Sequence, residues 1–175
     1  TFVAVDEDLT YAAVEATKDG TSDVLYVEES LVEAVLEAGR YTDYEVLETY
    51  TGEELVGWEY DHPLREEVPD APDFEGAGQV YTADYVEAED TGLVHSAPGH
   101  GEVDFERGQE LGLEVFCPVG EDGVFDERAG AYAGEYVKDA DEQIIADLEA
   151  NGALLARETE HHSYGHCWRG DTPII

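Results

Sequence analysis

The stretch from Thr91 to Phe105, TGLVHSAPGHGEVDF, constrains the fold most, because glycine, histidine and carboxylate residues crowd together at close spacing only there. It predicts a short apolar strand that ends at His95, a turn through residues 98–101, and a helix that begins near Glu102. Asp104 would then lie in the first turn of the helix, where the helix dipole favours an ionised carboxylate. His95 and Asp104 are therefore expected to flank one turn.

The other apolar runs are short and are separated by residues typical of turns. The expected strands lie at residues 2–5, 11–16, 24–27, within 44–60 (two strands, the second at 55–60), and at 79–86, 113–119 and 153–157. The first three are expected to form an antiparallel meander. Two capping boxes, Ser30 with Glu33 and Asp139 with Glu142, predict helices that end at Gly39 and at residues 151–152. The predicted fold is α+β and mainly β, a β-barrel of short strands decorated by about three helices.

The charge of the chain is extreme, since 44 Asp and Glu residues against 8 Lys and Arg residues give a net charge of −36. The acids are spread over almost every segment, as on a solvated surface, and this pattern is typical of a protein adapted to a salt-rich cytoplasm. Such a surface repels itself unless salt screens the charges, so we expect a compact structure to need salt. The charge also disfavours nucleic-acid binding in ordinary buffer, because phosphates are normally bound by basic patches.

The two cysteines, Cys117 and Cys167, provide no disulfide framework. Cys117 lies in the apolar run LEVFCPV and is expected to be a small buried hydrophobe. No apolar run approaches the roughly 20 residues of a membrane-spanning helix, so we expect a cytoplasmic chain that does not enter a membrane. The chain starts inside a strand pattern, FVAV, without an initiating methionine, and is expected to be a piece of a longer protein.

The central stretch resembles the segment Gly-Thr-Gly-x-Val-His-x-Ala-Pro-Gly-His-Gly-x-x-Asp-Phe/Tyr of isoleucyl-tRNA synthetases, which lies in their inserted editing (CP1) domain. Asp90 stands where the first glycine of that pattern is usual. The related valyl and leucyl enzymes usually have Pro-Ala-His-Asp after the strand, whereas residues 97–101 match the isoleucyl form. Signature motifs for ATP and aminoacyl-adenylate chemistry are absent from the sequence, so the resemblance implies an editing module.

Two further segments extend the resemblance over essentially the whole chain. Residues 55–63 are similar to the Leu-x-Gly-x-x-Tyr-x-x-Pro stretch of the same insert. Residues 162–173 are similar to His-Ser-Tyr-Pro-His-Cys-Trp-Arg-Cys-x-Thr-Pro, where the synthetase chain returns from the insert. The resemblance therefore implies an editing domain over residues 1–160 and a return segment, toward the catalytic domain, over residues 161–175.

The tail departs from the family pattern at two positions, with Gly165 in place of the proline and Gly170 in place of the second cysteine. Family members that keep both cysteines can bind zinc there together with a distant pair, because zinc sites take four N or S ligands. Cys167 alone weakens that expectation. A different metal site or a polar hinge are the other interpretations of the group His161, His162, His166 and Cys167.

The resemblance implies hydrolysis of valine that has been esterified to the isoleucine tRNA. A pocket for isoleucine rejects valine only weakly, since one methylene changes binding by about 1–3 kcal/mol, and a second, narrower site would hydrolyse the mischarged product. An ionised Asp104 is suited to hold the substrate α-ammonium while a water attacks the ester. His95 matches the position where its ring would obstruct the larger isoleucine. The other residues implied in substrate binding are Gly92, Val94, Ser96, Ala97, Pro98, Gly99, His100 and Gly101.

The implied partners are the aminoacyl-adenosine end of mischarged tRNA and the rest of the parent synthetase, with the chain itself a monomer. No cofactor is implied for this segment, whereas the parent enzyme would use ATP, magnesium and, in some members, zinc. In the family, a threonine-rich peptide, Thr-Thr-Pro-Trp-Thr-Leu-Pro-x-Asn, precedes the strand that begins here at Thr1 and forms one wall of the editing pocket. The chain as it stands is therefore expected to hydrolyse valyl-tRNA weakly.

Other interpretations of the same residues stay open. Residues 91–105 are also compatible with an ordinary connection whose polar groups satisfy turn hydrogen bonds. The whole chain is compatible with a non-catalytic acidic interaction module, or with the editing domain of a valyl-tRNA synthetase. A metal site is compatible with His95, His100 and Asp104. His62 is expected to be a turn residue rather than a ligand.

Overall fold

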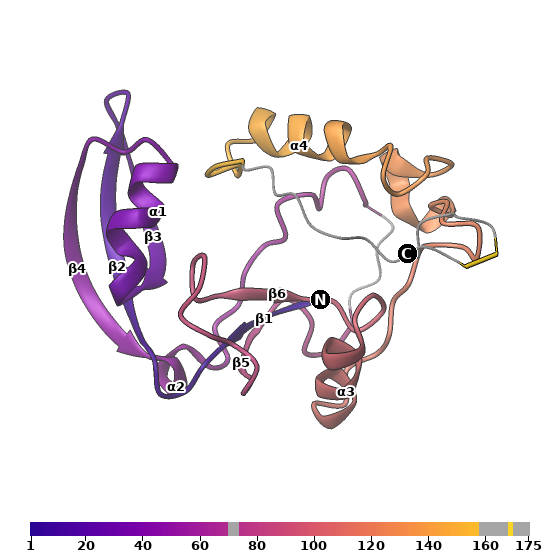
Figure 1. Ribbon diagram of the computed structural model, residues 1–175, viewed down its shortest axis with the longest axis horizontal. Helices are drawn as coiled ribbons and strands as arrows, with labels where there is room; N and C mark the ends of the chain where they lie inside the picture. Colours follow the sequence, from indigo (N-terminus) through magenta and orange to yellow (C-terminus); the bar gives the residue numbers. More distant parts are fainter. Residues whose placement is uncertain (70–73, 158–167, 170–175) are drawn as a thin grey trace.

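The computed structural model describes residues 1–69, 74–157 and 168–169, which form two three-stranded sheets with short helices around them (Figure 1). The first sheet has the order β3-β2-β4 and is antiparallel throughout. Its strands are β2 (Thr10–Lys18), β3 (Thr21–Glu28) and β4 (Asp43–Thr51). The β2–β3 hairpin turns through Asp19 and Gly20, both at positive φ, which is the conformation that a two-residue hairpin loop of this kind requires.

Helix α1 (Val32–Ala38) packs on one face of this sheet, at the left of Figure 1. The contact is made by residues of β2 and α1 that are each at most 5% exposed, namely Ala12, Val14, Ala16, Val32, Val35 and Leu36. The buried residues of α1 form one apolar face of the helix, with Leu31 only partly buried at its edge.

The second sheet has the order β5-β1-β6. Strand β1 (Phe2–Val5) lies in the middle, with β5 (Val80–Thr82) parallel to it and β6 (Val94–Ser96) antiparallel. The predicted antiparallel meander is therefore confirmed for the second and third strands and wrong for the first, which lies in the other sheet. The chain turns after β1, where the Asp6 N–H donates to the Tyr11 hydroxyl at 2.9 Å, and β2 then enters the other sheet.

A small shared core joins the two sheets. Val5, Tyr11, Leu55 and Val80 pack together, and each is at most 9% exposed. The fold is α+β and mainly β, as predicted, but the two sheets do not close into a barrel within the described residues. None of the helices in those residues is long and apolar enough to cross a membrane.

The first helix begins differently from the prediction. Ser30 is not its cap but lies in a short 3-10 helix, η1 (Glu29–Leu31), and donates from its N–H (2.9 Å) and its hydroxyl to the Glu28 carboxylate. Glu28 is only 6% exposed, so these bonds satisfy a buried polar group that would otherwise be costly. Helix α1 follows with no side-chain cap and ends at Gly39, as predicted.

The last helix, α4 (Asp141–Ala150), also lacks its predicted capping box. The N–H of Asp139 donates to the Tyr136 carbonyl oxygen at 2.8 Å, which places Asp139 in a turn before the helix. The predicted end at Asn151 and Gly152 is confirmed, with Gly152 at φ +79°, a conformation that glycine favours after a helix. A second 3-10 helix, η2 (Glu127–Tyr132), precedes α4 in the chain.

Three predicted strands do not form, namely those at residues 55–60, 113–119 and 153–157. The chain after β4 instead forms helix α2 (Gly52–Leu55), because Thr51 and Glu54 make a capping box at its start. The run containing Phe116 packs its backbone against the turn at Gly99 instead of pairing in a sheet. The strand predicted at residues 79–86 is reduced to the three residues of β5.

Candidate functional site

The central stretch folds into a strand, a turn and a helix, as predicted. Strand β6 ends at Ser96, and helix α3 (Glu102–Glu110) begins after a turn. Asp104 lies in the first turn of α3 and is half-buried. Its Oδ2 atom accepts the Ala97 N–H at 3.0 Å, so the carboxylate closes the turn that leads into its own helix.

The two oxygens of the Asp104 carboxylate have different surroundings. Oδ2 is held by Ala97, whereas Oδ1 has no hydrogen-bond partner among the described residues. The carboxylate also lies near Tyr85, whose pKa is raised first by burial and further by the negative charge of Asp104. One oxygen is thus fixed by the backbone, and the other makes no hydrogen bond within the described part of the protein.

His95 and His62 form a pair of imidazoles beside this turn. Their rings meet edge to face, with centroids 5.7 Å apart and planes inclined at 64°. Solvent reaches His95, but protein surrounds it on several sides, and this partial burial is the first cause that lowers its pKa. The charge of His62 lowers the pKa of His95 further, while Asp104 raises it. The pKa of His62 is also lowered, first by its own burial, so both rings are uncharged at neutral pH.

The residues before β6 are anchored to the first sheet. The Tyr11 hydroxyl donates to the Gly92 carbonyl oxygen at 3.0 Å, and the Glu28 N–H donates to the Thr91 carbonyl oxygen at 2.9 Å. Gly92 has φ +71°, and a Cβ built there would lie 2.4 Å from the Cβ of Glu28. Asp90, which replaces a glycine of the family pattern, has φ +51°, a left-handed conformation that aspartate tolerates better than most residues.

We predict that Gly92→Ala destabilises the chain by about 2–5 kcal/mol, because it combines left-handed strain with a clash against Glu28. The free energy of unfolding, from urea titration in molar KCl, measures this loss. Gly20→Ala is the matched control, since Gly20 has φ +81° but no atom lies within 4 Å of its added Cβ. The control should lose only the strain, about 1–2 kcal/mol. Equal losses in the two variants would contradict the role given to Glu28.

The other predicted binding residues divide into residues that support the turn and positions that stay accessible. Ser96 is fully buried, and its hydroxyl hydrogen bonds to the Tyr85 hydroxyl at 2.8 Å. Pro98 is buried against α3, and a Cβ at Gly99 would lie 2.3 Å from the Phe116 carbonyl oxygen. These three residues hold the turn in place. The remaining positions, Val94, Ala97, His100 and Gly101, are exposed or half-buried.

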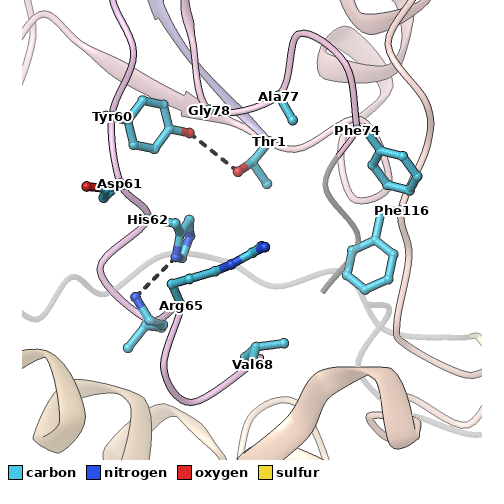
Figure 2. A pocket seen from close by; sticks show the side chains of 11 residues that line it. Thr1, Tyr60, Asp61, His62, Arg65, Val68, Phe74, Ala77, Gly78 and Phe116 are labelled. Carbon is cyan, nitrogen blue, oxygen red and sulfur yellow. Dashed lines mark hydrogen bonds between the residues drawn. The ribbon is translucent and has the colours of Figure 1, made fainter. Parts of the chain in front are cut away.

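A cavity of about 300 Å³ lies beside His62 (Figure 2). Phe74 and Phe116 line one side of it, and His62 lies on the opposite side. Thr1 Oγ1 and the Tyr60 hydroxyl, 3.4 Å apart, lie on a third side. Apolar walls with a few polar groups are typical of small-ligand sites. The sequence predicts a turn position for His62, but its place in the wall of a cavity was not predicted.

A second cavity, of about 700 Å³, is lined by residues 98–101 and by Cys117. Cys117 is half-buried and its Sγ lies 3.7 Å from the Val119 carbonyl oxygen. The prediction of a buried cysteine is therefore wrong, because this run lies against the turn and not inside a sheet.

No metal site is formed by His95, His100 and Asp104, since no three potential ligands come together in the part of the chain that the structure describes. The tail histidines, Cys167 and the glycine at 170 lie outside the described residues, so the zinc and hinge interpretations stay predictions.

The chain has relatives among known proteins that match it over its whole length. No family model matches the chain. The chain is 68% identical over its whole length to the isoleucine–tRNA ligase of Natronomonas pharaonis and 63% identical to that of Haloarcula marismortui, and it spans 16% of the length of each. The isoleucine–tRNA ligase of Archaeoglobus fulgidus is 52% identical over 99% of this chain and 17% of that protein.

A solved structure described as GlLeuRS-CP1 shares the fold, with a TM-score of 0.58 and 16% sequence identity over 93% of this chain and 79% of that one. The source organisms of the first two relatives, Natronomonas pharaonis and Haloarcula marismortui, are halophilic archaea, in agreement with the acidic composition of this chain. The chain therefore belongs to the isoleucine–tRNA ligase family, in which it corresponds to one segment of the longer relatives, and its fold is similar to that of a CP1 domain.

Proposed function

We propose that this segment is the editing module of an isoleucine–tRNA ligase and hydrolyses the ester of valine mischarged onto the isoleucine tRNA. The observation that carries the proposal is the Asp104 carboxylate, which is held to Ala97 by one oxygen while the other has no partner among the described residues. A ligase for isoleucine benefits from a second selection step, because a binding pocket for isoleucine rejects valine, which lacks one methylene, by only about 10–200-fold.

Asp104 would bind the α-ammonium of the substrate through Oδ1. This is a charge-assisted hydrogen bond, the stronger kind, and the Ala97 N–H already fixes the carboxylate, so little freedom is lost on binding. The ester carbonyl is one bond from the α-carbon and would lie next to the turn. A water oxygen then attacks the carbonyl carbon, and the ribose oxygen leaves with a proton, giving valine and free tRNA.

His95 would limit the size of the amino-acid side chain. Its lowered pKa keeps the ring neutral, so it does not repel the ammonium held by Asp104. A neutral ring in a fixed place would tolerate valine and obstruct the additional methylene of isoleucine.

The remaining parts of the proposal concern the neighbours of the module. Residues 1–160 would form the editing domain, and residues 161–175 would lead back toward the rest of the ligase. The ligand is the aminoacyl-adenosine end of the tRNA. The hydrolysis uses no cofactor on this proposal, and ATP and magnesium would serve the aminoacylation reaction of the longer protein.

We predict that His95→Ala, made in the full-length ligase, hydrolyses isoleucyl-tRNA at least about tenfold faster than the wild type does, because the obstruction is removed. Hydrolysis of both esters is measured in molar KCl with wild type and variant. Val103→Ala is the control, since Val103 is 51% exposed on α3 and has no assigned role. An unchanged rate on the isoleucyl ester would remove His95 from this role.

A further inference from the structure

We propose that His62 is a positioning residue of the same site, whose ring is held by the Leu64 N–H and packs against His95, fixing the His95 imidazole beside Asp104. The inference rests on the proposed function and adds to it a residue from a distant segment of the chain. Three observations support it: the local hydrogen bond of His62, its contact with His95, and its place in the wall of the cavity.

The orientation of His62 is fixed locally. Its Nδ1 atom accepts the Leu64 N–H at 3.2 Å (Figure 2), so in this state the ring proton is on Nε2. Pro63, between these two residues, has a fixed φ and restricts the backbone of the residue before it. The ring therefore has one tautomer and one direction before any ligand arrives.

His95 depends on this ring for its own orientation. Strand β6 fixes the backbone of His95 through its pairing with Val3 in β1, but the imidazole makes no hydrogen bond to any described residue. The edge-to-face contact with His62, at 5.7 Å between centroids, is the arrangement that aromatic rings prefer. A size limit at His95 requires a ring that stays in place, and His62 supplies the contact that holds it.

His62 also connects the turn to the cavity. It lines the cavity of about 300 Å³ together with Tyr60 and Arg65, whereas His95 is not one of the lining residues. In Figure 2 the His62 ring faces this space, and Arg65 extends into it. A ligand that enters the cavity would thus meet His62, and through it affect the position of His95.

Burial, and after it the neighbouring charges, keep the pair neutral. Burial first, and then the charge of Arg65, lower the pKa of His62. For His95, burial and then the charge of His62 lower the pKa, whereas Asp104 raises it. A protonated His62 therefore disfavours protonation of His95.

Two variants of His62 separate the ring from its hydrogen bond. His62→Asn keeps an acceptor for the Leu64 N–H but loses the ring, and His62→Phe keeps a ring but loses the acceptor. In the full-length ligase we expect His62→Asn to lower kcat for valyl-tRNA about tenfold with a smaller change in KM, because positioning is lost. We expect His62→Phe, whose ring can still pack on His95 but is no longer held by the Leu64 N–H, to lower kcat by less than His62→Asn does. A His62→Asn enzyme with wild-type kcat would overturn the proposal.

A second readout does not depend on hydrolysis. In NMR titrations of the chain in molar KCl, the midpoint of His95 should move to higher pH in both variants, because the charge of His62 is gone. His100→Phe is the control and should leave that midpoint unchanged, since His100 is not among the groups that shift His95. An unchanged His95 midpoint in a folded His62→Phe chain would also overturn the proposal. If instead the wild-type ligase fails to hydrolyse valyl-tRNA while the midpoints move, the proposed function is wrong and the histidine pairing stands.

Discussion

Replacing Asp104 with asparagine should lower hydrolysis of valyl-tRNA by at least about a hundredfold in the full-length ligase, while aminoacylation stays close to the wild-type rate. The asparagine oxygen can still accept the Ala97 N–H that now bonds Oδ2 at 3.0 Å, so the turn should keep its shape. Only the negative charge that would hold the α-ammonium is lost, and loss of such positioning costs orders of magnitude in rate. Deacylation of purified valyl-tRNA in molar KCl measures the effect.

Two further variants show which function of Asp104 is lost. Asp104→Ala removes both the charge and the bond to Ala97, so it should lose as much activity as Asp104→Asn and some stability as well. Glu102→Gln removes a charge from the same helix turn at an exposed position and should hydrolyse like the wild type. If Asp104→Asn deacylates at the parental rate, Asp104 only closes the turn and the ammonium must be bound elsewhere.

The chain should be expanded or unfolded in about 0.1 M KCl and should unfold cooperatively only in molar KCl. The net charge of −36 on 175 residues repels itself over a screening length of about 10 Å at 0.1 M salt, and over only about 3 Å at 1 M. The described structure has few cations to offset this charge, and exposed ion pairs such as that of Arg157 with Glu142 contribute little. Circular dichroism and thermal unfolding from 0.1 to 3 M KCl measure the transition.

A variant with fewer charges tests whether repulsion is the cause. Glu33, Glu37 and Glu45 are exposed, and their carboxylates make no hydrogen bond to a described residue. Changing all three to glutamine should therefore lower the KCl concentration at which half of the chain is folded. A wild-type chain that is equally stable at 0.1 and 3 M KCl, or a variant with the same salt midpoint, would show that charge repulsion does not set the stability.

Local features of the fold could be predicted from the sequence. The strand, turn and helix around His95 and Asp104 follow from the glycines and the proline between them, whose conformational preferences act within a few residues. The end of α4 at Gly152 follows from the same kind of local rule. The likeness to CP1 domains was also evident from short motifs, and the comparisons confirm it.

Features that depend on distant residues could not be predicted. Strand β1 leaves the predicted meander because Val3 pairs with Val80 and His95, and no local pattern encodes that choice. Ser30 does not cap α1, because a buried Glu28 needs its donors. The contact between His62 and His95 could not be predicted either, since it forms only when the fold brings two distant segments together.

The rates at which the full-length wild-type ligase hydrolyses valyl-tRNA and isoleucyl-tRNA, both on the isoleucine tRNA and in molar KCl, test the central claim most directly. The same tRNA in both substrates keeps the tRNA contacts equal, so the ratio reports only on the amino acid. The account predicts that the valyl ester is hydrolysed at least about tenfold faster than the isoleucyl ester, and well above the spontaneous rate. Equal rates for the two esters, or rates equal to spontaneous hydrolysis, would contradict it.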